Sequence, residues 1–167
     1  MLKFADVLLA EFDREAGLTR RVLVRVPADR FEWRPHEKSM TLGRLVTHLA
    51  ELPGWGASLV ATTEYDLANR PATDLTDLTL DAVLARFDAN VAAMRQAIVS
   101  RTDPELVAPW TLKSEGREIF TAPRLVALRT LLLDHSTHHR GQLTVYLRLL
   151  DVPLPALYGP SADEGRI

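Results

Sequence analysis

The sequence predicts an all-α protein built as a four-helix bundle. Four long segments carry apolar residues at helical spacings of three and four, and no comparably strong set of strand patterns accompanies them. The chain has 167 residues, of which 47% are hydrophobic, so one domain over residues 1–167 with a substantial core is expected. Bundles of this kind build metal sites from side chains on facing helices.

The composition argues against several kinds of partner. Lys plus Arg is 20 against 22 for Asp plus Glu, a net charge of -2, which gives no electrostatic footprint for nucleic acid. The absence of cysteine leaves only nitrogen and oxygen ligands for a metal. The first residues lack the apolar run of a signal peptide, and no stretch reaches the roughly 18 apolar residues of a membrane span. A cytoplasmic protein without membrane contact is expected.

The first helix is expected over residues 2–26 and ends at Pro27, because proline disfavours the α conformation in the residue before it. Residues 28–40 form a connection whose aromatic side chains pack over one end of the bundle. His36 lies in this connection beside Pro35. A solvated loop histidine is expected there rather than a metal ligand.

The second helix begins at Thr41, or with Ser39 as its N-cap. His48 lies between apolar positions three before and four after it, so its side chain points into the core. Pro53 and the glycine after it can kink the helix before the apolar face continues. Glu51 lies one turn after His48, about 60° around the helix, and is either a proton-transfer group or an ordinary solvated carboxylate.

The third helix, over residues 80–101, carries an apolar face without histidine and is expected to serve packing alone. It follows a linker over residues 69–78, and either Asp77 or Thr79 caps it. Residues 103–122 are expected to be irregular. Within them, alternating residues on both sides of 114–116 predict a small hairpin that lies as a flap over a bundle end.

The fourth helix, from about residue 123 to 150, carries His135 and His139 one turn apart. They are separated by roughly 40° at about 100° per residue, a spacing at which two imidazoles can bind one metal ion. The pair alone more often represents two surface or partly buried imidazoles than a metal site. His48 favours the metal site, because buried imidazoles on apolar faces need polar partners. Gly141 in this helix indicates either close approach of another group or simple tolerance, at a cost of about 1 kcal/mol relative to alanine. A proline-rich tail over residues 153–160 should lie against the body.

Three stretches resemble the DinB superfamily, also called the DinB/YfiT-like group. They are Thr-Leu-Gly-Arg-Leu-Val-Thr-His-Leu at 41–49, His-Ser-Thr-His-His-Arg-Gly-Gln-Leu at 135–143 and Tyr-Gly at 158–159. The resemblance covers nearly the whole chain. It implies a bundle in up-down-down-up order, a homodimer, and one divalent metal ion held by His48, His135 and His139. His138 has no ligand role in that pattern, and it lies about 100° around the helix from His139.

The resemblance also implies a chemistry, because characterised members include thiol-dependent transferases that use bacillithiol or mycothiol, and maleylpyruvate isomerase. The first hypothesis is therefore an enzyme whose ion, zinc or nickel before manganese or iron, activates water or a low-molecular-weight thiol against a small-molecule substrate. Gln142 and Tyr146 could orient that substrate, since they share the metal face, and Glu51 could move a proton. The alternative is a non-catalytic, metal-binding or stress-related dimeric protein. An open coordination position favours the enzyme, whereas a fourth protein ligand favours the structural role.

Overall fold

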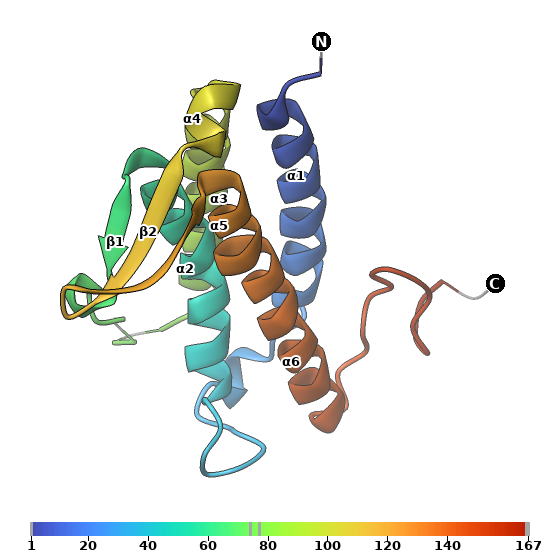
Figure 1. The fold of residues 1–167 in the computed structure, drawn as a ribbon. Coiled ribbons are helices and arrows are strands. Elements are labelled where there is room, and N and C mark those ends of the chain that lie inside the picture. The colour runs from blue at the N-terminus through green and yellow to red at the C-terminus, as the bar shows by residue number, and fades with distance from the viewer. Residues whose placement is uncertain (1, 74, 77, 166–167) are drawn as a thin grey trace.

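Four long helical stretches lie side by side and enclose the core in this computed structural model, which describes residues 2–73, 75–76 and 78–165 (Figure 1). The first three are α1 (Phe4–Leu23), α2 (Leu42–Ala61) and α3 (Leu80–Val99). The fourth runs through α5 (Arg124–Leu128), a π-helical segment (Arg129–Asp134) and α6 (His135–Leu149). Helices α1 and α2 each pack against both α3 and α6. The four expected helices are confirmed, while their up-down-down-up order stays a prediction.

The helix starts follow the expected capping chemistry. Thr41 caps α2, its hydroxyl accepting from the Arg44 N–H at 3.2 Å, and Thr79 caps α3 in the same way. Asp77, the other predicted cap, lies outside the described residues. Helix α1 is shorter at both ends than the predicted 2–26, and the segment expected to be irregular contains the short helix α4 (Asp103–Val107). Two 3-10 turns, Ala28–Arg30 and Leu67–Asn69, lie in the connections on either side of α2.

Helix α2 continues through Pro53 without ending. Proline cannot donate a backbone hydrogen bond, so the helix is locally weakened there. The Asn90 amide of α3 reaches this turn and donates to the Ala50 carbonyl at 2.8 Å. Gly54 makes room for it, because a Cβ at that position would lie 2.7 Å from the Asn90 Oδ1 atom. The turn that follows His48 is therefore fixed by α3.

A three-stranded sheet at one side of the helices corrects the all-α prediction (Figure 1). The predicted hairpin is present as β2 (Pro109–Ser114) and β3 (Arg117–Pro123), paired antiparallel. The additional strand β1 (Glu64–Asp66) pairs parallel with β2, placing Tyr65 opposite Leu112. Strand β1 has three residues, and its partner lies far along the chain, so no alternation could reveal it.

Asp66 ties β1 to the hairpin turn. Its carboxylate accepts from the backbone N–H of Glu115 at 3.0 Å and of Gly116 at 2.7 Å. Both turn residues have positive φ, 51° and 76°, which suits glycine and is uncommon for glutamate. Backbone hydrogen bonds, led by the Ala68 N–H, lower the pKa of Asp66. The sheet is thereby held in one position beside the end of α2.

The π-helical segment Arg129–Asp134 departs from the expected continuous α-helix and leads directly into His135. A π turn changes the direction of the side chains that follow it, and such turns occur often at functional sites. The His135 backbone N–H bonds to the Leu132 carbonyl at this junction. Within the described residues, no helix is long and apolar enough to cross a membrane.

Candidate metal centre

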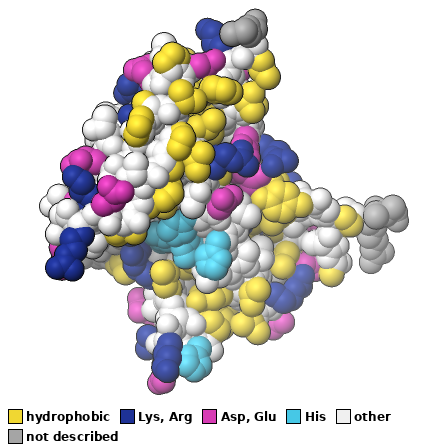
Figure 2. All heavy atoms as spheres, viewed as in Figure 1, with side chains coloured by type: hydrophobic (Ala, Val, Ile, Leu, Met, Phe, Trp, Pro, Cys, Tyr) yellow, Lys and Arg dark blue, Asp and Glu magenta, His cyan; other side chains and the backbone are white. Residues whose placement is uncertain are grey.

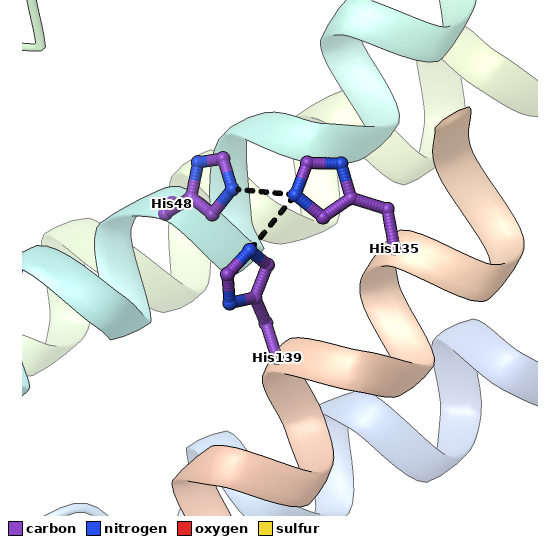
Figure 3. A group of neighbouring side chains, drawn as sticks. All are labelled: His48, His135 and His139. Carbon is purple, nitrogen blue, oxygen red and sulfur yellow. Dashed lines mark hydrogen bonds between the residues drawn. The ribbon is translucent and has the colours of Figure 1, made fainter. Parts of the chain in front are cut away.

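Three histidine side chains converge between α2 and α6, as Figure 3 shows. The Nε2 atom of His135 lies 3.2 Å from that of His48 and 2.8 Å from that of His139. The ring centroids of His48 and His139 are 4.5 Å apart. One ligand atom from each residue lies within 4.8 Å of the others. The structure thus brings together the three residues that the sequence proposed as ligands.

Burial favours the neutral form of all three rings. His48 and His139 are buried and His135 is half-buried. Burial, followed by the neighbouring charges of His139 and His135, lowers the pKa of His48 from 6.5 to about 3. Burial also lowers the pKa of His135 and of His139, although hydrogen bonds to Leu131 and Gln142 act in the opposite direction. Neutral imidazoles offer the lone pairs that a metal ion needs.

Two of the three rings have an acceptor for the nitrogen that points away from the cluster. The Gln142 Oε1 atom lies 2.7 Å from His139 Nδ1, and the His135 ring hydrogen-bonds to the Leu131 backbone. When both carbonyl oxygens accept from Nδ1–H, the neutral rings carry bare lone pairs on Nε2. These two Nε2 atoms are 2.8 Å apart. With both rings in that tautomer, a cation bound by both Nε2 atoms would remove the repulsion between the lone pairs, and the lowered pKa values disfavour a proton in that place.

The donor set fits a divalent transition-metal ion. A Zn–N bond of about 2.0–2.1 Å with tetrahedral angles places neighbouring ligand nitrogens roughly 3.3 Å apart. The two Nε2 separations, 3.2 and 2.8 Å, lie near that value. Within the described part of the chain, no carboxylate joins the group. Three protein ligands leave a coordination position open, as in catalytic rather than structural zinc sites.

A cavity of about 530 Å³ opens beside the cluster, with His48 and His135 in its wall. Most of its wall is apolar, and the larger side chains are Leu52, Trp55, Tyr65, Leu67, Leu112 and Leu131. Strands β1 and β2 supply Tyr65 and Leu112, so the small sheet completes the cavity. Figure 2 shows histidine side chains reaching the surface near the middle of one face of the molecule. The volume suits a small-molecule ligand.

The three residues proposed for catalysis lie in different places. Glu51 lines the cavity, where its carboxylate accepts from Thr73 at 2.9 Å and pairs with Arg86 at 3.4 Å. Gln142 holds the His139 ring, as described above. Tyr146 is buried, and its hydroxyl donates to the Met40 carbonyl at 3.2 Å. Of the three, only Glu51 lies in the cavity wall, and all three catalytic roles stay predictions.

The remaining histidines lie outside the cluster. His36 is in the exposed loop, where its Nδ1 atom accepts from the Lys38 N–H at 3.1 Å. His138 is exposed, and its ring meets that of His139 at a centroid distance of 5.0 Å without entering the cluster. A Cβ on Gly141 would meet nothing within 4 Å. Of the two interpretations of that glycine, simple tolerance is therefore the one that fits.

Sequence reasoning missed Arg70, whose Nη2 atom lies 3.3 Å from His48 Nδ1. It also missed the cavity wall formed by Trp55 and Tyr65, whose ring centroids are 5.9 Å apart. Arg70 lies in the predicted linker, where no periodicity constrains the direction of a side chain. The sequence signal at Arg70 is the proline that follows it, and this predicts an extended backbone at Arg70 but not which side chain it contacts.

These features define a small helical protein with a cluster of three histidines beside an apolar cavity. The DinB family model matches residues 1–166, and the chain belongs to the DinB family. Two Bacillus subtilis (strain 168) proteins described as uncharacterised are similar to it. YrdA is 25% identical, with 98% of this chain and 93% of YrdA covered. YjoA is 26% identical, with 86% and 89% covered.

Solved structures show the same fold. A DinB-like protein from Bacillus cereus ATCC 10987 superposes with a TM-score of 0.70 at 20% identity, over 95% of this chain and all of the other. The Bacillus subtilis DinB-like protein YjoA superposes with a TM-score of 0.66 at 19% identity, over 88% of this chain and 94% of the other. At these identities the likeness concerns the fold alone.

Proposed function

We propose that this protein binds one divalent metal ion through His48, His135 and His139 and acts on a small molecule held in the adjoining cavity. The observation that carries the proposal is the convergence of three Nε2 atoms on one point. Imidazole ligands suit zinc, nickel, copper and iron better than manganese, and we take zinc or nickel as the first candidates.

A divalent ion at this point would lower the pKa of a water or thiol ligand toward neutrality and so supply a nucleophile. The protein's own residues prepare the site for that chemistry. Gln142 and the Leu131 carbonyl fix the orientation of two of the rings, as partners of metal-binding histidines commonly do. The apolar wall of the cavity excludes water from the open side. A thiol S-transferase reaction is the form that we favour, with a low-molecular-weight thiol as cosubstrate.

Glu51 is the carboxylate that we propose to move a proton, because it lies in the cavity wall near His48. Arg86 and Thr73 hold its position. We assign Gln142 and Tyr146 to positioning roles. Gln142 acts on His139, and the Tyr146 ring packs edge-on against Trp33 at a centroid distance of 5.6 Å.

The test combines elemental analysis with an activity screen. Purified protein should contain about one zinc or nickel ion per chain and, once loaded, should transfer a thiol to an electrophilic reporter. A panel of bacillithiol, mycothiol, glutathione and cysteine identifies the cosubstrate, and His48→Ala is the inactive control. Stoichiometric metal without transfer of any of these thiols to the reporter would instead support the non-catalytic, stress-related alternative.

The homodimer implied by the family resemblance is part of the proposal. Sedimentation equilibrium of the metal-loaded chain should give twice the mass of 18.7 kDa. A mass that stays at the monomer value across the concentration range would exclude it.

A further inference from the structure

Arg70 places a positive charge in the wall of the cavity, directly against a proposed metal ligand. Its Nη2 atom lies 3.3 Å from His48 Nδ1. The backbone fixes its starting point, since the Arg70 N–H closes the 3-10 turn on Leu67 at 3.1 Å and Pro71 follows. Arg70 makes no ion pair with any residue that the structure describes. Within that part of the chain, no carboxylate competes with a ligand for its charge.

In the metal-bound state the Nδ1–H group of His48 lacks a hydrogen-bond acceptor among the described residues. When Nε2 of His48 binds an ion, Nδ1 keeps the ring proton and can only donate. The corresponding nitrogens of His135 and His139 face carbonyl oxygens, whereas His48 Nδ1 faces the guanidinium of Arg70, which has donors and no acceptor. Metal-binding histidines almost always give this proton to a carboxylate, a carbonyl or water. Among the residues that the structure describes, none offers an acceptor to His48 Nδ1, so a bound ligand is a suitable source of one.

The cavity gives this position a net positive character. Glu51 is the carboxylate of the wall, but Arg86 at 3.4 Å and Arg44 at 4.0 Å balance its charge. Arg70 adds a further cation. The apolar remainder of the wall, with Trp55 and Tyr65 at its aromatic corner, suits a hydrocarbon or aromatic body. The lining therefore combines an apolar chamber with one anion-binding corner beside the histidine cluster.

We infer that the cavity takes a small molecule with an apolar or aromatic body and a carboxylate, which accepts from both Arg70 and the His48 Nδ1–H. The inference rests on the proposed metal site in one respect, namely that the ion fixes the proton on Nδ1. A carboxylate suits the gap because its two oxygens can each accept a charge-assisted hydrogen bond. The same contact orients the ligand, with its anionic end beside His48 and its body along the apolar wall. Arg70 is thus a specificity-determining residue.

The test measures binding of 3-phenylpropionate and of its neutral counterpart 3-phenylpropionamide by isothermal titration calorimetry. Both probes have the same body, so their difference reports the anionic group. Each is titrated into metal-free and zinc-loaded protein, as wild type, Arg70→Gln and Arg34→Gln. Arg34 is an exposed loop residue outside the cavity wall, so its replacement changes the net charge equally without touching the site. Circular dichroism and metal content are recorded for each variant.

We expect wild type to prefer the carboxylate and Arg70→Gln to bind it at least about tenfold more weakly, as loss of a charge-assisted hydrogen bond implies. Binding of the amide should not change in that variant, and Arg34→Gln should bind both probes as wild type does. Zinc should strengthen carboxylate binding in wild type more than in Arg70→Gln.

Three results would overturn the inference. They are no binding of the carboxylate, equal affinity for the two probes in wild type, and equal carboxylate affinity in wild type and Arg70→Gln. Equal affinities would mean that water fills the position beside Arg70.

The same experiment tests the metal site separately. Arg70-dependent carboxylate binding in a protein that takes up no metal refutes the metal proposal alone, whereas metal uptake without Arg70 dependence refutes the anion site alone.

Discussion

Helix α6 contributes to two buried polar clusters that differ in how completely the protein satisfies them. The first is the histidine cluster. The second joins Arg140 of α6 to Glu15 of α1, with exposed fractions of 1% and 6%. Arg140 donates to the Glu15 carboxylate at 2.6 Å and to the Thr19 hydroxyl at 3.0 Å. The Tyr158 hydroxyl contacts both members of the pair.

The difference separates a structural cluster from a functional one. In the Glu15–Arg140 cluster the two charges oppose each other, and the Arg140 Nη atoms and the hydroxyls of Thr19 and Tyr158 have acceptors within the chain. In the histidine cluster the Nε2 atoms of His135 and His139 lie 2.8 Å apart with no carboxylate of the described chain beside them, and His48 Nδ1 faces the Arg70 guanidinium. A buried group without a partner costs free energy, so the second cluster needs components from solution. The run from His135 to Gln142 therefore contains two proposed ligands together with Arg140, which holds α6 against α1.

The largest expected effect concerns the structural cluster. Arg140→Met removes the buried cation of Glu15 and leaves the exposed Arg14, at 2.8 Å, as its remaining cation among the described residues, so it should lower the free energy of unfolding by about 3 kcal/mol. Urea denaturation measures the loss. Arg20→Met, which removes an exposed partner of Asp88 at 2.8 Å, is the matched control and should cost no more than about 1 kcal/mol. Equal effects of the two substitutions would show that the Glu15–Arg140 cluster does not secure the fold.

The histidine cluster should add to stability only when metal is present. At a zinc concentration about a hundredfold above Kd, wild type should gain about 2.7 kcal/mol over the metal-free protein. His135→Ala should gain far less, because it removes the Nε2 atom that lies 3.2 Å from His48 Nε2 and 2.8 Å from His139 Nε2. His138→Ala should gain as much as wild type. Thermal melts with and without a chelator measure the gain, and a His138 variant that behaves like the His135 variant would refute the assignment.

The sequence predicted the structure best where residues of one chemical type, here histidines, recur at helical spacing. The helical spacing of His48, His135 and His139 was enough to predict that their side chains face one another. Patterns said nothing where structure depends on contacts between distant segments. Strand β1 exists through its pairing with β2, and Arg70 reaches His48 only because the linker folds back over α2. The π turn before His135 leaves no signal in an apolar run.

Acidification should distinguish the two clusters by their pH range. The pKa of His48 falls from 6.5 to about 3 in the folded protein, so unfolding takes up a proton between these values. Stability of the metal-free protein therefore decreases as the pH drops below about 6.5. Burial raises the pKa of Glu15, but hydrogen bonds from Tyr158 and Arg140 outweigh it and lower the pKa below 4.5, so that contribution is lost only at more acidic pH.

Urea denaturation between pH 4.5 and 7 compares wild type with His48→Leu. The variant should show a flatter dependence over this range, because the histidine proton uptake is removed. Parallel curves would mean that His48 does not titrate in the way that its burial requires. In zinc-loaded wild type, the dependence should be steeper, because protons and metal compete for the same nitrogens.

The smallest expected effect concerns Gly141, at a position on α6 where no other described part of the protein comes close. Gly141→Ala should stabilise the protein by up to about 1 kcal/mol, since helical propensity improves and a Cβ meets nothing within 4 Å. Metal affinity should not change. Gly56→Ala provides the contrast, because its Cβ would lie 2.6 Å from the Leu132 Cδ2 atom and would force the core to move. A destabilised Gly141 variant would reveal a contact at this position, such as a partner chain.

The most direct measurement is X-ray absorption spectroscopy of the zinc-loaded protein. The account predicts one zinc ion per chain, with nitrogen or oxygen ligands at about 2.0–2.1 Å. Multiple scattering should fit three imidazoles, and the signal of one imidazole should disappear in His139→Ala. A spectrum with one imidazole or none, or an unchanged spectrum in His139→Ala, would contradict the three-histidine site.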